Sequence, residues 1–191
     1  MLAFISFFAF LLRVVVPSSY YQVDYKSFYQ LQEVNQNIDW TNPNIQLLEA
    51  AIFQCTNEQR VINKKSIFIY AEDLNKSATY HSISMVKYNF FSHTNNYKKK
   101  MKAFYQRMKF FGASFNGCGE NIAYSEYDGS YNYLEVARDI AELWMDSEGH
   151  RMNILNADYK ELGCGIAIKK VSGLYRVYAT QDFGSKRNIP H

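Results

Sequence analysis

The sequence predicts an α+β protein in which helices and a few strands form layers around one core. The chain has 191 residues, of which 48% are hydrophobic, and this suits a single domain. Apolar residues recur at helical spacing in four segments, and two strand-like segments close the chain, without the alternating βαβ order of a doubly wound sheet. The motifs GxGxxG, GxxxxGKS/T and GxSxG are absent, which argues against dinucleotide-binding, P-loop and serine-hydrolase proteins.

Charge and cysteine content exclude further classes. The 21 Lys and Arg residues against 18 Asp and Glu give a net charge of +3, less than a dedicated nucleic-acid binder usually carries, so we expect no nucleic-acid partner. The three cysteines contain no CxxC spacing, which argues against a zinc ribbon or a thioredoxin-type pair. At most one internal disulfide can form.

The N-terminus has the composition of a secretory signal. Met1–Leu12 is apolar except for one serine, and Arg13 and Pro17 interrupt the run before the roughly 20 apolar residues that a spanning helix needs. We therefore interpret residues 1–19 as a signal peptide of a secreted, extracellular protein. No Lys or Arg precedes the run, so an uncleaved membrane anchor is the alternative.

The next segment, residues 20–44, is polar and aromatic without a sustained period and ends in the turn signal Asn42-Pro43-Asn44. We interpret it as a poorly ordered leader, with the domain beginning at residue 45.

Two helices are expected next. Residues 45–63 form the first, with Cys55 on its inner face, and the second starts near Glu72. In the second helix His81 shares a face with apolar residues, so we expect it to be a core group. Asn75 begins an Asn-x-Ser sequon in that helix and is a possible glycosylation site if it faces solvent.

A third helical segment, residues 96–111, has an apolar stripe, with its lysines and Arg107 mostly off it. A solvated lysine face is the more frequent explanation of such a pattern, and contact with an anionic membrane is the alternative. A fourth helix is expected from Tyr133 to Trp144. Residues 162–168 and 175–183 then form an antiparallel hairpin through residues 169–173.

Three residues are the best candidates for chemistry. His93 and His150 each follow the end of an expected helix, where a side chain can project into a cleft, and Glu120 lies between them in the chain. Two imidazoles and one carboxylate suit Zn²⁺ or another divalent ion with open coordination positions. A hydrogen-bonded His/Glu network inside the fold is the alternative.

Six segments in order resemble the CAP superfamily, the cysteine-rich secretory, antigen 5 and pathogenesis-related proteins that carry the SCP domain. The form of the fifth segment is most similar to the compact bacterial-type branch. The segments are Asn57-x-x-Arg60, Ala78-x-x-His81-Ser82-x-x-Met85, Phe91-Ser92-His93, Gly119-Glu120-Asn121-Ile122-Ala123, Trp144-x-x-Ser147-x-Gly149-His150-Arg151-x-Asn153-Ile154-Leu155 and Thr180-Gln181-Asp182-Phe183-Gly184.

The resemblance implies a secreted three-layer α-β-α sandwich, here residues 45–187, with a central cleft. It makes His93, Glu120 and His150 the candidate ligands of a divalent metal, Zn or Mg. The second acid of the family's site is replaced by Ser147, which leaves three ligands and a weaker site.

Two more residues are candidates for ligand binding and two for a disulfide. Asn121 and Ser147 are candidate ligand-binding residues, although Asn121 could instead cap a strand end. Cys118 and Cys164 are the favoured disulfide, because Cys164 lies in the hairpin strand expected to pair near the Gly-Glu-Asn segment.

The leading function is a binding or recognition module for a divalent metal, a small ligand or an extracellular partner, and this interpretation is favoured over an enzyme. A metal-dependent hydrolase with Glu120 as ligand or general base is the first alternative. A nucleophilic Cys118 assisted by His93 or His150, and a lipid or sterol carrier, are weaker ones. Membrane contact is expected only through an uncleaved N-terminal segment.

Overall fold

The computed structural model describes residues 17–185. The predicted signal peptide lies almost entirely outside the described residues, as do the last two residues of the predicted domain. The elements, in chain order, are the 3-10 helix η1 (Pro17–Tyr21), α1 (Tyr25–Tyr29), η2 (Glu33–Asn35), α2 (Ile45–Ile62), β1 (Ile69–Tyr70), α3 (Glu72–Tyr88), η3 (Lys99–Met101), α4 (Phe104–Phe110), β2 (Cys118–Tyr127), α5 (Tyr133–Asp146), α6 (Glu148–Leu155), β3 (Tyr159–Val171) and β4 (Leu174–Ser185).

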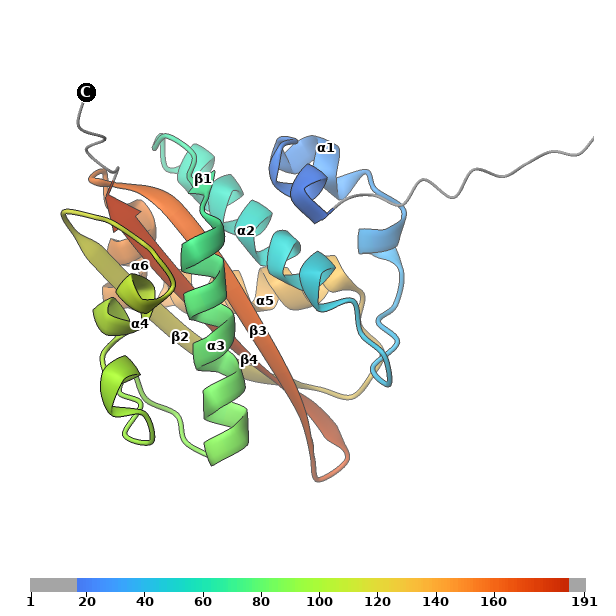
Figure 1. The fold of residues 1–191 in the computed structure, drawn as a ribbon. Coiled ribbons are helices and arrows are strands. Elements are labelled where there is room, and N and C mark those ends of the chain that lie inside the picture. The colour runs from blue at the N-terminus through green and yellow to red at the C-terminus, as the bar shows by residue number, and fades with distance from the viewer. Residues whose placement is uncertain (1–16, 186–191) are drawn as a thin grey trace, which may run out of the picture.

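A four-stranded sheet in the order β1-β3-β4-β2 forms the middle layer (Figure 1). β1 runs parallel to β3, and the other neighbours are antiparallel. α3 and α4 pack on one face of the sheet, and α2, α5 and α6 on the other. This arrangement confirms the three-layer α-β-α sandwich. Among residues 17–185, no helix has the length and apolar content needed to cross a membrane.

Local sequence signals explain where the main elements begin and turn. The Asn132 side chain accepts a hydrogen bond from the Glu135 amide, and Glu135 accepts one from the Asn132 amide, so a capping box starts α5. Ser172 and Gly173 both have positive φ, the pair of conformations that a tight two-residue hairpin turn requires. The hairpin expected near the end of the chain is confirmed, with longer strands.

The close contact between α3 and β3 depends on two glycines. A Cβ placed on Gly165 would lie 1.9 Å from the Thr79 amide nitrogen, and one on Gly163 would lie 2.0 Å from the Asn75 amide nitrogen. The absence of side chains at these positions lets the helix backbone rest directly on the strand. This contact fixes α3, and with it His81, over the sheet.

Residues 20–44 are packed against the domain, and the prediction of a poorly ordered leader is wrong. Phe28 and Val34 are fully buried, and Trp40 stacks on Tyr175 with ring centroids 4.9 Å apart. The Gln54 side chain of α2 donates to the Tyr20 carbonyl at 2.8 Å. The segment consists of short helical turns joined by loops, so its buried aromatics follow no period that the sequence could display.

The segment predicted as a helix over residues 96–111 is divided into η3 and α4, and its inner face differs from the expected one. Arg107, predicted off the apolar stripe, is fully buried beside Met108, whereas Tyr105 of the predicted stripe is exposed. The buried arginine has a carboxylate partner in β2 that the spacing of apolar residues does not reveal. This pair is the centre of the candidate site.

Candidate functional site

A buried carboxylate, Glu120 of β2, lies between an arginine and a histidine. Its Oε1 accepts a hydrogen bond from His93 Nδ1 at 2.8 Å, and its Oε2 pairs closely with Arg107 Nη2. Burial alone would raise the pKa of this carboxyl, but the His93 hydrogen bond and the Arg107 charge outweigh it and lower the pKa below its ordinary value. Glu120 is therefore ionised at neutral pH.

His93 has a defined orientation as a result. An ionised carboxylate only accepts hydrogen bonds, so Nδ1 carries the proton and Nε2 is the nitrogen with a free lone pair. The side chain is 49% exposed, in contrast to the fully buried Glu120 carboxylate beneath it. The structure thus presents the second ring nitrogen of His93 as an oriented acceptor or ligand atom.

Arg107 of α4 contacts both members of this pair. Its Nη1 donates to the Lys102 carbonyl at 3.0 Å, and its Nη2 donates to the His93 carbonyl at 3.2 Å. One guanidinium therefore connects Glu120, the backbone of His93 and the backbone just before α4. Sequence reasoning placed Arg107 on the solvent side. It is the one arginine among the lysines of that segment, and this was the available signal, because Arg suits buried multidentate pairing and Lys does not.

His150 of α6 lies on the other side of the site. Its Nδ1 is buried without a hydrogen-bond partner among the described residues. Burial, and then the charge that His93 carries when protonated, lower its pKa. The His150 carbonyl accepts a hydrogen bond from Asn121, which follows Glu120 in β2, so the two predicted histidines contact neighbouring residues of one strand.

Asn121 positions His150 and is itself buried. Its Nδ2 donates to the His150 carbonyl and to Gln181 Oε1, each at 3.1 Å, and its Oδ1 accepts from Asn153 Nδ2 at 2.9 Å. Because the whole amide is used in these contacts, Asn121 ties α6 to the sheet, and the structure does not support its predicted role as a ligand contact. Ser147 is the N-cap residue of α6, and its ligand-binding role stays a prediction.

Two further buried groups surround Glu120. His81 Nε2 donates to the Ser92 carbonyl at 2.9 Å and lies 4.0 Å from Glu120 Oε1, which places His81 in the core as expected. Asp182 of β4 is paired directly with Glu120 across the β2–β4 ladder and is fully buried. Burial, and then the Glu120 charge, raise the pKa of Asp182 well above its ordinary value, which favours its neutral form. Sequence reasoning included Asp182 in a motif but gave it no role.

The predicted three-residue metal set is not formed. Residues 17–185 contain no group of three or more His, Cys, Asp or Glu side chains placed to hold a metal ion. Both Glu120 oxygens are occupied by Arg107 and His93, and a carboxylate already paired with a guanidinium is a poor ligand. Glu120 is thus a positioning residue behind His93, and only the two histidines remain as candidate ligands.

The predicted Cys118–Cys164 disulfide is wrong. Both thiols are free, and β4 lies between the strands that carry them, with Cys118 opposite Gly184 and Cys164 opposite Gln181. Two strand spacings already separate the strands by about 9–10 Å, and the three-residue offset along β4 increases the distance, so a disulfide is out of reach. The prediction assumed that the hairpin strand containing Cys164 was the neighbour of β2.

The predicted glycosylation of Asn75 is also not supported. Its Nδ2, the atom that would carry the sugar, donates to the Cys164 carbonyl at 2.5 Å and to Glu49 Oε2 at 3.2 Å. The side chain therefore points from α3 toward the sheet and α2 instead of toward solvent.

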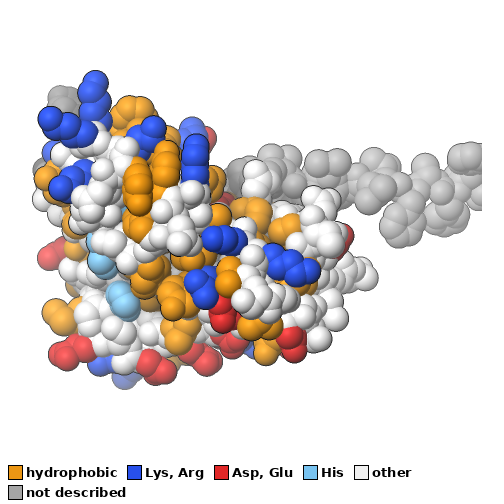
Figure 2. Space-filling view, turned by 90° about the horizontal axis from the view of Figure 1, so that it is seen from below, with side chains coloured by type: hydrophobic (Ala, Val, Ile, Leu, Met, Phe, Trp, Pro, Cys, Tyr) orange, Lys and Arg blue, Asp and Glu red, His pale blue; other side chains and the backbone are white. Residues whose placement is uncertain are grey.

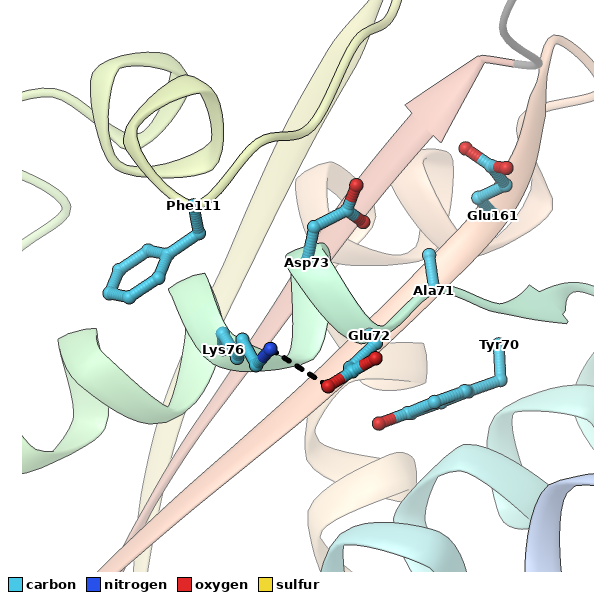
Figure 3. A pocket seen from close by; sticks show the side chains of 7 residues that line it. All are labelled: Tyr70, Ala71, Glu72, Asp73, Lys76, Phe111 and Glu161. Atoms are coloured by element: carbon cyan, nitrogen blue, oxygen red, sulfur yellow. Dashed lines mark ion pairs between the residues drawn. The ribbon is translucent and has the colours of Figure 1, made fainter. Parts of the chain in front are cut away.

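A separate hollow of about 440 Å³ lies at the start of α3 (Figure 3). Glu72 forms an ion pair with Lys76 at 2.8 Å, and Asp73 lies beside it in the first turn of the helix. Acidic side chains in a first turn stabilise a helix N-terminus. The hollow contains none of the predicted site residues, and the carboxylates of Glu72 and Asp73 have this structural explanation.

Comparison with known proteins gives a consistent family. The model of the cysteine-rich secretory protein family, CAP, matches residues 55–183. The membrane protein YlbC of Bacillus subtilis is 33% identical over 135 residues, covering 71% of this chain and 34% of its own length. The chain thus spans about a third of that relative.

Two solved structures have the same fold. An extracellular SCP-domain protein of Bacillus anthracis shares 28% identity, with a TM-score of 0.57 over 74% of this chain and 42% of its own. The structure of NaASP2 with Zn²⁺ shares 15% identity, with a TM-score of 0.50 over 78% of this chain and 84% of its own. From the sandwich, the ordered motifs and the matched family model, the chain belongs to the cysteine-rich secretory protein (CAP) family.

Proposed function

We propose that this protein is a secreted CAP-domain binding module whose ligand contacts the imidazoles of His93 and His150. The observation that carries the proposal is the hydrogen bond from His93 Nδ1 to the buried Glu120 carboxylate, since it orients an exposed ring and leaves Nε2 free. The apolar N-terminal segment, together with the extracellular SCP-domain protein of Bacillus anthracis, supports secretion.

A divalent metal ion is the ligand class that suits this pair best. Metal-binding histidines usually donate their other ring nitrogen to a carboxylate, which is what His93 does to Glu120. The buried, unpartnered Nδ1 of His150 is a second nitrogen lacking a partner in the structure. NaASP2, which has the same fold, was solved with Zn²⁺. A bound ion would supply a Lewis-acidic centre for an extracellular ligand, while His93 and His150 would hold the ion and Glu120 would orient His93.

The hydrolase alternative is not favoured by the site. It requires Glu120 to act as a metal ligand or as a general base, and both carboxylate oxygens are already engaged. The thiol alternative is weaker still, because burial raises the pKa of Cys118 to about 11 and keeps it protonated at neutral pH.

The test is isothermal titration of Zn²⁺ and of Mg²⁺ into the chelator-treated full chain at neutral pH. We expect saturable Zn²⁺ binding that the double variant His93→Ala/His150→Ala abolishes. Glu120→Gln should weaken it by about 10–100-fold, the usual effect of removing a carboxylate behind a metal-binding histidine. Circular dichroism of each variant checks that the chain is folded.

His191→Ala is the matched control, since it removes the one histidine of the sequence other than His81, His93 and His150. It should bind Zn²⁺ as the wild type does. Zn²⁺ binding that survives the double variant would place the ion elsewhere, and a wild-type chain that binds neither ion would refute the metal proposal.

A further inference from the structure

The stretch between Asp73 and Glu120 contains no acidic residue. All of its charged side chains are cationic, and most of them cluster in the part that we call the lysine lobe, residues 95–110, which contains η3 and α4. The cationic residues of the stretch are Lys76, Lys87, Lys98, Lys99, Lys100, Lys102, Arg107 and Lys109. This local excess is far greater than the net charge of +3 for the whole chain indicates.

The lysines of the lobe are exposed and unpaired, whereas its arginine is buried. None of the ion pairs between described residues involves a lysine of the lobe. Exposed in this way are Lys98, Lys99, Lys100, Lys102 and Lys109. The positive charge of these side chains is thus directed to solvent, with no ion-pair partner within residues 17–185.

The backbone that carries these lysines is held in place. The backbone N–H of the buried Asn95 donates to the Lys102 carbonyl at 2.8 Å and closes the loop. The Arg107 side chain donates to the same carbonyl. The Tyr97 ring stacks on Tyr88 of α3 with centroids 4.6 Å apart. A preorganised loop loses less conformational entropy on binding than a flexible tail of the same charge.

Exposed aromatic side chains accompany the lysines. Tyr97, Tyr105 and Phe110 are 57%, 45% and 59% exposed. Figure 2 shows a face of the molecule on which Lys and Arg side chains gather at one end, with hydrophobic side chains among and beside them. Lysine and aromatic side chains together are typical of protein surfaces at the membrane–water interface, where rings enter the headgroup region and ammonium groups contact lipid phosphates.

We propose that the lysine lobe is a docking surface for an anionic phospholipid membrane. Each lysine near such a surface strengthens binding by roughly fivefold. The exposed Phe110 ring favours a lipid surface over a soluble polyanion, because a lipid interface removes this ring from water and a hydrophilic polyanion does not. The proposal does not depend on the His93/His150 ligand. It would bring the site close to the membrane, because Arg107 binds both the lobe and His93.

The experiment compares binding of the full chain to phosphatidylcholine vesicles and to vesicles of phosphatidylcholine mixed with phosphatidylserine. Because the apolar N-terminal segment can bind both, the readout is the ratio of the two affinities. In the variant Lys98→Ser/Lys99→Ser/Lys100→Ser/Lys102→Ser we expect this ratio to fall by roughly a hundredfold or more, at about fivefold for each lysine. Added salt should lower the wild-type ratio toward that of the variant.

The matched control removes four exposed lysines elsewhere, and therefore the same net charge. Its ratio should stay close to that of the wild type. The substitutions are Lys26→Ser, Lys64→Asn, Lys65→Ser and Lys170→Ser. An equal fall in the control and in the lobe variant would attribute binding to net charge and overturn the proposal.

The variant Tyr105→Ser/Phe110→Ser separates lipid from soluble polyanions. It should weaken binding to the anionic vesicles several-fold and leave binding to heparin, a soluble polyanion, unchanged. Tight heparin binding through the lobe lysines, with no effect of the aromatic substitutions on vesicle binding, would identify a polyanion site and refute membrane docking.

Discussion

Glu120 and three other ionisable side chains lie together in the core, and their environments favour different charge states. Glu120 and Arg107 form a charged pair, which offsets the cost of burying either one. Burial favours the neutral forms of His81 and Asp182, since it lowers the pKa of His81 to about 4 and raises that of Asp182 well above the ordinary value. One net charge pair therefore replaces four buried charges.

His81 predicts a pH dependence of stability. Burial, opposed by the Glu120 charge, lowers its pKa from 6.5 to about 4. The unfolded chain therefore takes up a proton at this histidine before the folded chain does, and stability is lost as pH falls from about 6.5 to about 4. By linkage, this difference corresponds to about 3 kcal/mol at pH 4 relative to pH 7.

Urea unfolding at a series of pH values measures this effect, with His81→Gln as the comparison. The raised pKa of Asp182 acts in the opposite sense over part of the same range, so the quantity of interest is the wild-type slope minus the variant slope. We expect the wild type to lose more stability than His81→Gln between pH 6.5 and pH 4. Parallel curves would show that His81 is protonated equally in both states.

At the scale of elements, the contact between α3 and β3 decides the position of the site. Gly163 and Gly165 face the α3 backbone, and the same helix carries His81 toward Glu120. The strand pairing then places Asp182 opposite Glu120. Small residues in one strand thus determine how closely a helix approaches the carboxylate of another strand.

Gly165→Ala should be strongly destabilising. Its Cβ would lie 1.9 Å from the Thr79 nitrogen and 2.2 Å from the Ala78 carbonyl carbon, both backbone atoms that cannot rotate away. Forcing helix and strand apart should cost about 3 kcal/mol or more in the free energy of unfolding, measured in urea.

Gly149→Ala in α6 is the matched control. A Cβ there meets nothing within 4 Å, and alanine is the better helix former, so we expect a gain of about 0.5–1 kcal/mol. Equal stability of the two variants would mean that α3 does not rest on β3 as described.

On the scale of the whole molecule, the segment before α2 belongs to the core. Its buried side chains contact α2, β2 and β4, and the Ile38 amide donates to the Tyr131 carbonyl at 2.9 Å. The segment therefore closes one side of the domain as a part of its structure.

Phe28→Ala tests this packing. The ring is fully buried and contacts Tyr20 edge-on, so its removal should lower the free energy of unfolding by about 3–5 kcal/mol. Val23→Ala, at a side chain 40% exposed in the same segment, should change stability by less than about 0.5 kcal/mol. A small effect of Phe28→Ala in thermal or urea unfolding would show that the segment is loosely attached.

The family, the layer architecture and most of the long elements follow from features that the sequence displays directly. Helical periods are local, so α2, the start of α3, α5 and the β3–β4 hairpin were predicted close to their observed bounds. The ordered motifs also identified His93, Glu120 and His150, which the structure does bring together.

The roles of those residues, in contrast, depend on contacts between segments that are distant in the chain. The placement of β4 between β2 and β3 excludes the predicted disulfide, sets Asp182 beside Glu120, and depends on pairing between residues far apart in the chain. The burial of Arg107, which changes Glu120 from a metal ligand into the group that orients His93, likewise depends on α4 meeting β2. Local spacing records which face of an element is apolar, but the partner of a buried charge is fixed only when two distant segments meet.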